Sequence, residues 1–219
     1  MIVNYARSHE EARATVAEIS ALGVRALLLR AHLGEPARIQ EMFQRVEKEF
    51  GRLDILVNNA ASGVQRGSLD LEVKHWDWTL DINTRAPWLC AKEAARLMSS
   101  GGRIVNITSL GSHLVLDNYV AVGVSKAGLE ALTRYLAVEL APQGIVVNAV
   151  AGGVVDTDVL KHFPNREEMI GESLRRTPAG RLVTPEDMAE VVAFLCSDKA
   201  EMIRGQILVV DGGISLLGL

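Results

Sequence analysis

Two side chains able to exchange a proton stand seven positions apart in one helical segment. Tyr119 and Lys126 both fall within residues 118–140, whose apolar spacing predicts a long helix. Seven helical steps turn about 700°, so both side chains are expected on one helix face, about 10 Å apart along the axis. A lysine near a phenol stabilises the phenolate and lowers the pKa of the tyrosine. Such a tyrosine can donate a proton to a carbonyl or enolate oxygen.

Taken alone, this pair favours an ordinary interpretation, a half-buried tyrosine and a solvated lysine. The ends of the neighbouring strands favour chemistry instead. Three predicted strands run into amides, hydroxyls or glycines: 54–58 into Asn58 and Asn59, 103–107 into Thr108 and Ser109, and 146–149 into Gly152 and Gly153. Because ligands of open parallel sheets bind at the carboxyl ends of the strands, we expect these residues to converge on one site.

Short apolar runs alternate with longer amphipathic segments along the chain. The predicted strands are 1–5, 24–30, 54–58, 103–107, 146–149 and 207–210; the predicted helices are 9–22, 35–50, 76–98, 118–140 and 188–196, the last after a capped start at 184–187. This order predicts right-handed crossovers and a single α/β domain with a doubly wound, Rossmann-like parallel sheet.

Composition narrows the functional classes. The 219 residues suffice for one such domain, and a net charge of −4 argues against a nucleic-acid partner. Cys90 and Cys196 lie in apolar segments and favour small buried hydrophobes over a disulfide or a metal site. No run reaches the ~20 apolar residues of a membrane helix, and the N-terminus has no signal-peptide pattern. A cytosolic protein is therefore expected.

The whole chain resembles the short-chain dehydrogenase/reductase superfamily. The motifs that carry the resemblance are Asn58-Asn59-Ala60, Asn83 within 81–84, 107–109, Tyr119 to Lys126, Gly153 to Thr157 and the terminal 211–213. The resemblance is strongest to the NADPH-dependent enoyl-[acyl-carrier-protein] reductase III subgroup, through segments such as 3–8, 58–63 and 161–166. It implies a homotetramer whose interface is built from helices 76–98 and 118–140.

One departure from the superfamily majority is informative. Most members place the tyrosine four positions before the lysine, where this chain has Val122. Enoyl reductases use the longer spacing of Tyr119 to Lys126. The resemblance therefore implies reduction of the 2,3 double bond of trans-2-enoyl thioesters, on acyl carrier protein or CoA, by NADPH in fatty-acid elongation. The alternatives are a 3-oxoacyl or other carbonyl reductase, and an inactive truncated form.

The resemblance also implies roles for single residues. Tyr119 supplies a proton at the thioester enolate, and Lys126 holds the nicotinamide ribose and lowers the phenol pKa. Ser109 matches the serine that orients a carbonyl. Asn83 matches an asparagine that kinks its helix and supports the lysine through water, although a packing amide is the simpler interpretation. The remaining residues expected to bind the cofactor are Asn59, Ala60, Gly153, Val155 and Thr157, of which Thr157 and the Val155 backbone match the clamp on the nicotinamide carboxamide.

Other segments are expected to bind the adenosine end of the cofactor and to cover the substrate. Arg7 and Ser8 follow the first strand, where dinucleotide folds read the ribose, and an arginine there favours a 2′-phosphate and hence NADPH over NADH. Without that context Arg7 is a surface arginine. His32 and Leu33 occupy the positions expected near adenine. Residues 156–180 match a flap over the substrate, or a plain surface hairpin.

The first strand, glycine-rich loop and first helix of the superfamily have no counterpart here, and no G-x-x-x-G-x-G motif occurs. That strand belongs between the predicted strands 1–5 and 54–58, so its absence would leave a slot of ~10 Å in the sheet. The chain is therefore expected to be N-terminally truncated, either as a fragment or as a genuine short form. We expect the 219 residues to have little activity and restored upstream codons to recover it.

Overall fold

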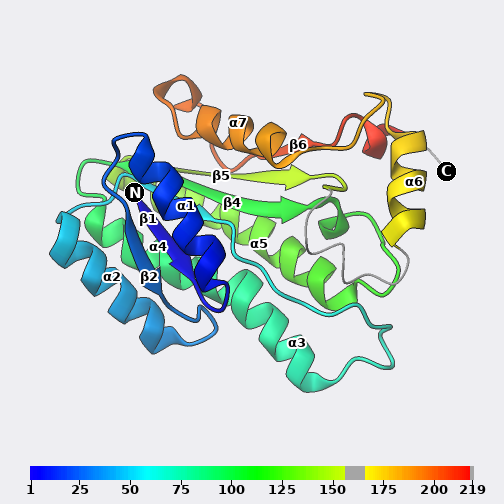
Figure 1. Ribbon diagram of the computed structural model, residues 1–219, viewed down its shortest axis with the longest axis horizontal. Coiled ribbons are helices and arrows are strands. Elements are labelled where there is room, and N and C mark those ends of the chain that lie inside the picture. The colour runs from blue at the N-terminus through cyan, green and yellow to red at the C-terminus, as the bar shows by residue number, and fades with distance from the viewer. Residues whose placement is uncertain (156–165, 218–219) are drawn as a thin grey trace.

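The computed structural model describes residues 1–155 and 166–217, apart from the side chain of Met169 (Figure 1). The strands are β1 Ile2–Tyr5, β2 Leu27–Arg30, β3 Ile55–Asn58, β4 Gly102–Ser109, β5 Ile145–Gly152 and β6 Ile207–Val210. The α-helices are α1 His9–Ala21, α2 Pro36–Phe50, α3 Val73–Leu80, α4 Ala86–Leu97, α5 Val120–Glu139, α6 Arg166–Arg176 and α7 Pro185–Leu195. The α/β class and the alternation of strands and helices are confirmed.

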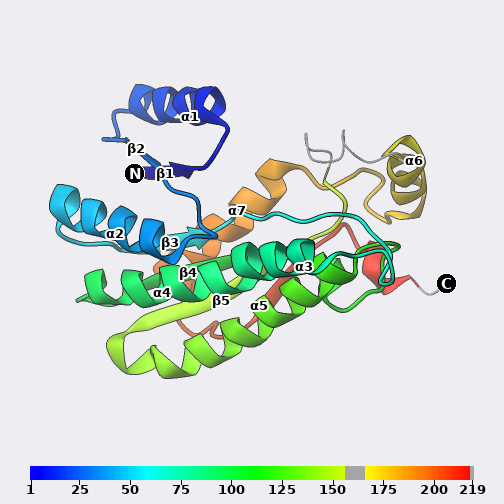
Figure 2. The same ribbon diagram turned by 90° about the horizontal axis from the view of Figure 1, so that it is seen from below.

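The strands pair in parallel, as predicted, but within the described ranges they form two sheets. One sheet contains β1 and β2, and the other has the order β3-β4-β5-β6. The interruption falls between β1 and β3, where the sequence analysis expects a slot. Ile55 and Val57 of β3 are 45% and 41% exposed. In Figure 2, β1, β2 and α1 form a separate group beside β3.

Helices cover both faces of the four-stranded sheet (Figure 1). Neighbouring residues of β4 contribute to the hydrophobic cores on both faces of the sheet, because successive side chains point to opposite faces. Ile104 joins the larger core with Ile39 of α2 and Ala86 of α4. Val105 joins the smaller core with Leu195 of α7. The sheet is thereby buried on both sides, as its apolar strands require.

Two predicted helices differ from the observed ones. The segment 76–98 is not one continuous α-helix: α3 ends at Leu80, a π-helix spans Asp81–Arg85, and α4 follows. The helix expected at 118–140 begins only at Val120, because Asn118 has a φ of 56° and lies in the left-handed region. Tyr119 is consequently the N-cap of α5 and not a residue of its first turn.

Strands β4 and β5 are longer than predicted. Their parallel register pairs Gly102 with Ile145 and continues to Ser109 with Gly152. Among the extra residues, Ile145 and Val150 suit a strand, whereas the others are polar or small, and pairing with the neighbouring strand extends β4 and β5 over them. This register places Ser109 at the carboxyl edge of the sheet.

Two expectations drawn from the apolar segments concern the cysteines and membrane-spanning helices. Cys90 and Cys196 are both free, and burial raises the pKa of the Cys90 thiol to about 12. None of the helices in the described part of the chain combines the length and apolarity needed to cross a bilayer.

Candidate active site

Tyr119 stands at the rim of an open pocket of about 330 Å³ at the start of α5. Its main chain is held on both sides, because its N–H donates to the carbonyl of Leu116 at 3.3 Å and its carbonyl accepts from the N–H of Gly123 at 2.7 Å. The residues lining the pocket include Arg66, Gly111, His113, Leu116, Tyr119 and Gly123. The candidate phenol therefore faces a space that can admit a substrate.

Lys126 lies about two helical turns further along α5 and is 6% exposed. Its Nζ donates a hydrogen bond of 2.7 Å to the carbonyl of Ile107 on β4. Burial lowers the pKa of Lys126 to about 8, because desolvation disfavours the ammonium form. The lysine is thus held at the sheet edge, beside the end of β4.

The expected lowering of the Tyr119 pKa by Lys126 is wrong for this structure. Burial raises the pKa of the phenol, and the hydroxyl of Ser109 opposes that rise. The physical reason is that desolvation penalises phenolate and ammonium alike, while Nζ of Lys126 is engaged by Ile107. At neutral pH the phenol is therefore protonated and available as a proton donor.

Ser109 ends β4 next to the phenol. Its Oγ is shielded from solvent, and its interaction with the Tyr119 hydroxyl opposes the rise in the pKa of the phenol. A hydroxyl in this position fits a ligand oxygen that meets the phenol, because buried polar atoms are usually hydrogen-bonded. The structure thus brings Ser109 and Tyr119 together, as the sequence analysis expects.

Asn83 lies in the π-helix between α3 and α4 and is almost fully buried. Its Oδ1 accepts from the N–H of Ser62 at 2.8 Å, and its Nδ2 donates to the Ser62 carbonyl at 2.8 Å and to Ser125 Oγ at 2.9 Å. The expected helix irregularity is present. Within the described residues Asn83 makes no direct hydrogen bond to Lys126 and instead holds its neighbour Ser125 and the loop after β3.

A second layer of buried amides supports this site from beneath. Asn58 of β3 donates to Oδ1 of Asn106 on β4 at 2.8 Å, and Asn106 donates to Oγ1 of Thr133 on α5 at 2.8 Å. The sequence analysis assigned no role to Asn106 or Thr133. The available signal was an amide inside an otherwise apolar strand, because such a group needs buried partners.

Val122, at the position where most superfamily members have tyrosine, does not line the pocket described above. It packs on the loop after β3: a Cβ atom added to Gly63 would lie 2.3 Å from Cγ2 of Val122. A side chain as large as tyrosine at position 122 would have to displace that loop. The geometry leaves Tyr119 as the phenol at this pocket.

The residues expected at the adenosine end lie after β1 and β2. Arg7 and Ser8 are exposed. Leu33 packs against the larger hydrophobic core, and His32 lies 3.8 Å from Oε1 of Glu35 through Nδ1. Arg30 was not identified from the sequence. Its Nε donates to the Ala6 carbonyl at 3.4 Å, which brings a second guanidinium beside the turn that contains Arg7.

The other residues expected to bind the cofactor follow β3 and β5. Asn59 and Ala60 are exposed directly after β3. Gly153 continues from β5, where its N–H donates to the Val210 carbonyl at 2.9 Å, and Val155 forms an isolated bridge with Val183. Thr157 lies outside the described residues. These segments share the carboxyl edge of the larger sheet with Ser109.

The candidate flap at 156–180 is described only in its second part. Residues 156–165 lie outside the described ranges, and Arg166–Arg176 forms α6. Ser173 and Thr177 of this part are buried, with Thr177 Oγ1 donating to the Ser173 carbonyl at 2.6 Å.

Comparison with known proteins shows the family of this chain. A family model described as Enoyl-(Acyl carrier protein) reductase matches residues 1–215. The chain is 41% identical to 1-cyclohexenylcarbonyl-CoA reductase of Streptomyces collinus, over 99% of this chain and 78% of that protein. It is 38% identical to a 3-oxoacyl-[acyl-carrier-protein] reductase of Staphylococcus aureus, over 97% of this chain and 86% of that protein.

Solved structures show the same fold. The enoyl-acyl carrier protein reductase of Bacillus cereus, determined with NADP+ and indole naphthyridinone, superposes with a TM-score of 0.91 at 29% identity, covering 99% of this chain and 86% of that one. Acetoin dehydrogenase from Salmonella typhimurium superposes with a TM-score of 0.87 at 32% identity, covering 99% and 87%. The chain therefore belongs to the short-chain dehydrogenase/reductase superfamily of oxidoreductases, within the family described as Enoyl-(Acyl carrier protein) reductase.

Proposed function

We propose that this protein reduces the 2,3 double bond of trans-2-enoyl thioesters, carried on acyl carrier protein or CoA, with NADPH. The observation that carries the proposal is the position of the phenol. Tyr119 faces the pocket from the N-cap of α5, while Val122 packs on Gly63. The similarity to a reductase named for a cyclohexenylcarbonyl-CoA substrate supports the same chemistry.

The described residues fit a nicotinamide nucleotide at the carboxyl edge of the sheets. Ser109 interacts with the phenol, and the buried Lys126 donates to the carbonyl of Ile107, two residues before Ser109 on β4. In this proposal Lys126 holds the nicotinamide ribose. Thr157 and the Val155 backbone hold the nicotinamide carboxamide, Asn59, Ala60 and Gly153 also bind the cofactor, and His32 and Leu33 lie near the adenine. Arg7 and Ser8 bind the 2′-phosphate, and Arg7 offers a bidentate guanidinium to it.

NADPH, when bound, supplies the hydride that adds to the β-carbon. The chain's own residues handle the charge that develops on the thioester oxygen. Tyr119, kept protonated by its raised pKa, donates a hydrogen bond or proton to that oxygen. Lys126, whose pKa is about 8, is mostly cationic at pH 7 and stabilises the developing negative charge. Ser109 orients the oxygen.

A second candidate is a 3-oxoacyl reductase, favoured by the 38% identity to the Staphylococcus aureus enzyme. Crotonyl-CoA and acetoacetyl-CoA separate the two functions when each is mixed with NADPH and the loss of nicotinamide absorbance is followed. Enzyme is used at substrate-level concentration, because low turnover is expected. Oxidation of NADPH with crotonyl-CoA alone supports enoyl reduction. Oxidation with acetoacetyl-CoA alone favours the second candidate, and a chain inert toward both thioesters lacks the proposed activity.

The proposed quaternary state is a homotetramer of a cytoplasmic enzyme. Trp88 on α4 and Tyr135 and Val138 on α5 are large apolar side chains that are 46%, 69% and 75% exposed. Burial of such side chains against a second copy would remove apolar area from water. Sedimentation velocity measures the state directly, and a Tyr135→Lys variant should shift the boundary toward the monomer.

In the same proposal, residues 156–180 cover the acyl substrate.

A further inference from the structure

The ring of Tyr119 lies directly on Gly111. A Cβ atom added to Gly111 would lie 2.6 Å from Cε1 and 2.7 Å from Cδ1 of the ring. Packed carbon atoms ordinarily stand about 3.5–4.0 Å apart, so any side chain at Gly111 requires a shift of about 1 Å in the ring or in its own turn. The lack of a side chain at Gly111 therefore allows the Tyr119 ring to lie against the main chain of Gly111.

Backbone conformation does not explain the glycine at this position. Gly111 lies in the short 3-10 turn Leu110–Ser112, and it is not among the glycines with a positive φ. An alanine would adopt the same backbone without strain. The space that a side chain would fill is the space that the Tyr119 ring occupies.

Gly123 brings the first turn of α5 against the main chain of Gly111. A Cβ atom on Gly123 would lie 2.7 Å from the Gly111 carbonyl oxygen and 3.8 Å from Cδ1 of Tyr119. Glycine within a helix is less favourable than alanine, and here it permits the close approach of two main chains. The N–H of Gly123 also holds the Tyr119 carbonyl at 2.7 Å.

We propose that Gly111 is a positioning residue that sets the Tyr119 phenol beside Ser109, with Gly123 allowing the first turn of α5 to approach the Gly111 main chain closely. The phenol is fixed from its ring edge and from its own main chain, so its hydroxyl has a defined position at the pocket. A misplacement of about 1 Å at a reacting group can cost about 100-fold in rate. This inference deepens the proposed function and rests on it for its kinetic test.

The kinetic test is a double-mutant cycle of Gly111→Ala and Tyr119→Phe, assayed with crotonyl-CoA and NADPH. We expect Gly111→Ala to lower kcat about 100-fold while KM for NADPH changes less than about twofold. In the Tyr119→Phe background, the added alanine should cause no further loss, because the hydroxyl that it displaces is already gone. An equal loss in both backgrounds, or a wild-type rate for Gly111→Ala, would overturn the proposal.

A second test needs no substrate. The chain has three tyrosines, so the ultraviolet titration difference between wild type and Tyr119→Phe isolates the Tyr119 phenol. Gly111→Ala should shift that titration, because the ring leaves its position beside Ser109; an unchanged titration contradicts the proposal. If wild type reduces no enoyl thioester, the proposed function fails, whereas this titration still tests Gly111.

Gly123→Ala covers the case in which Gly111→Ala does not fold. Alanine is more favourable than glycine in a helix, but its methyl group must displace the Gly111 carbonyl, which a Cβ atom would approach to 2.7 Å, so circular dichroism is recorded to check that the variant is folded. It should shift the Tyr119 titration in the same way. A Gly123→Ala protein with the wild-type titration would overturn the proposal.

Discussion

The ammonium group of Lys126 donates a 2.7 Å hydrogen bond to the main-chain carbonyl of Ile107, and this bond ties α5 to β4 at the candidate site. The lysine is nevertheless buried at a cost, since burial lowers its pKa from 10.5 to about 8. Below pH 8 the folded protein carries a desolvated charge. Between pH 8 and 10.5 the folded state releases its proton before the unfolded state does.

Lys126→Met removes this titration. Because a lowered lysine pKa penalises folding below the folded-state value, wild type should gain about 3 kcal/mol of unfolding free energy relative to Lys126→Met as pH rises from 7 to 10.5. Urea unfolding of both proteins at several pH values measures the difference. A difference that stays constant across that range contradicts the expectation. The variant should also lose enoyl reduction.

Moving the phenol to the majority position should not restore activity. Tyr119→Phe is expected to lower kcat by about 100-fold or more, the usual contribution of a positioned proton donor. Val122→Tyr in that background should recover nothing, because Gly63 lies on the Val122 side chain. Steady-state kinetics with crotonyl-CoA measure both variants. Val122→Ala, which adds no atoms, is the control and should fold normally; recovery of the rate by Val122→Tyr would show that the loop yields.

Asn83→Ala should lower both stability and rate. The substitution leaves both main-chain groups of Ser62 and the hydroxyl of Ser125 without their partner, which should cost about 3 kcal/mol in unfolding free energy. It also removes the hydrogen bond that holds Ser125, the residue next to Lys126. Chemical denaturation and kcat are the two measurements.

Asn4→Ala is the matched control for that variant. The Asn4 amide likewise donates to two main-chain carbonyls, of Leu29 and Ala31, but it lies on β1. It should lower stability while preserving kcat. If both variants reduce kcat equally at matched folded fractions, the positioning role of Asn83 is wrong.

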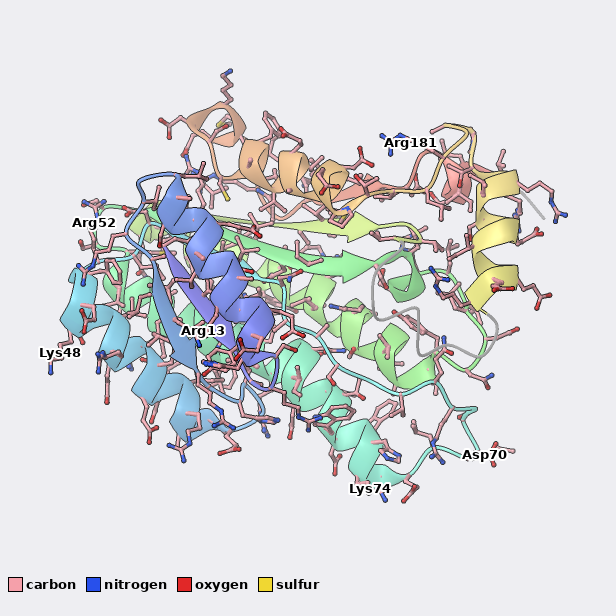
Figure 3. The ribbon with its side chains drawn as sticks, in the orientation of Figure 1. Arg13, Lys48, Arg52, Asp70, Lys74 and Arg181 are labelled. Carbon is pink, nitrogen blue, oxygen red and sulfur yellow. The ribbon has the colours of Figure 1, made fainter. Side chains whose placement is uncertain are left out.

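Arg7→Ala should weaken NADPH binding selectively. Loss of a charge-assisted contact to the 2′-phosphate is expected to raise the Kd for NADPH about tenfold or more and to leave the Kd for NADH within twofold. Nucleotide fluorescence titration reports both constants. Arg13→Ala, on α1 and labelled in Figure 3, is the control. An equal weakening of both nucleotides would argue for a general charge effect.

Several features followed directly from the sequence. The alternation of apolar runs and amphipathic segments predicted the parallel α/β fold, because each pattern has its own period. The polar ends of 54–58 and 103–107 and the pair Tyr119 and Lys126 predicted the edge at which the site lies. Asn83 was identified as a helix irregularity through the family resemblance, and the π-helix confirms it.

The sequence by itself determined the order of the elements, the residue types of the site and the family. Only the tertiary structure decided how those side chains meet. Residue spacing placed Tyr119 on a helix, whereas the left-handed conformation of Asn118 makes it an N-cap. The sequence also suggested a lowered phenol pKa, whereas burial raises it. Desolvation depends on which groups surround a side chain in the folded protein, and local periodicity carries no information about them.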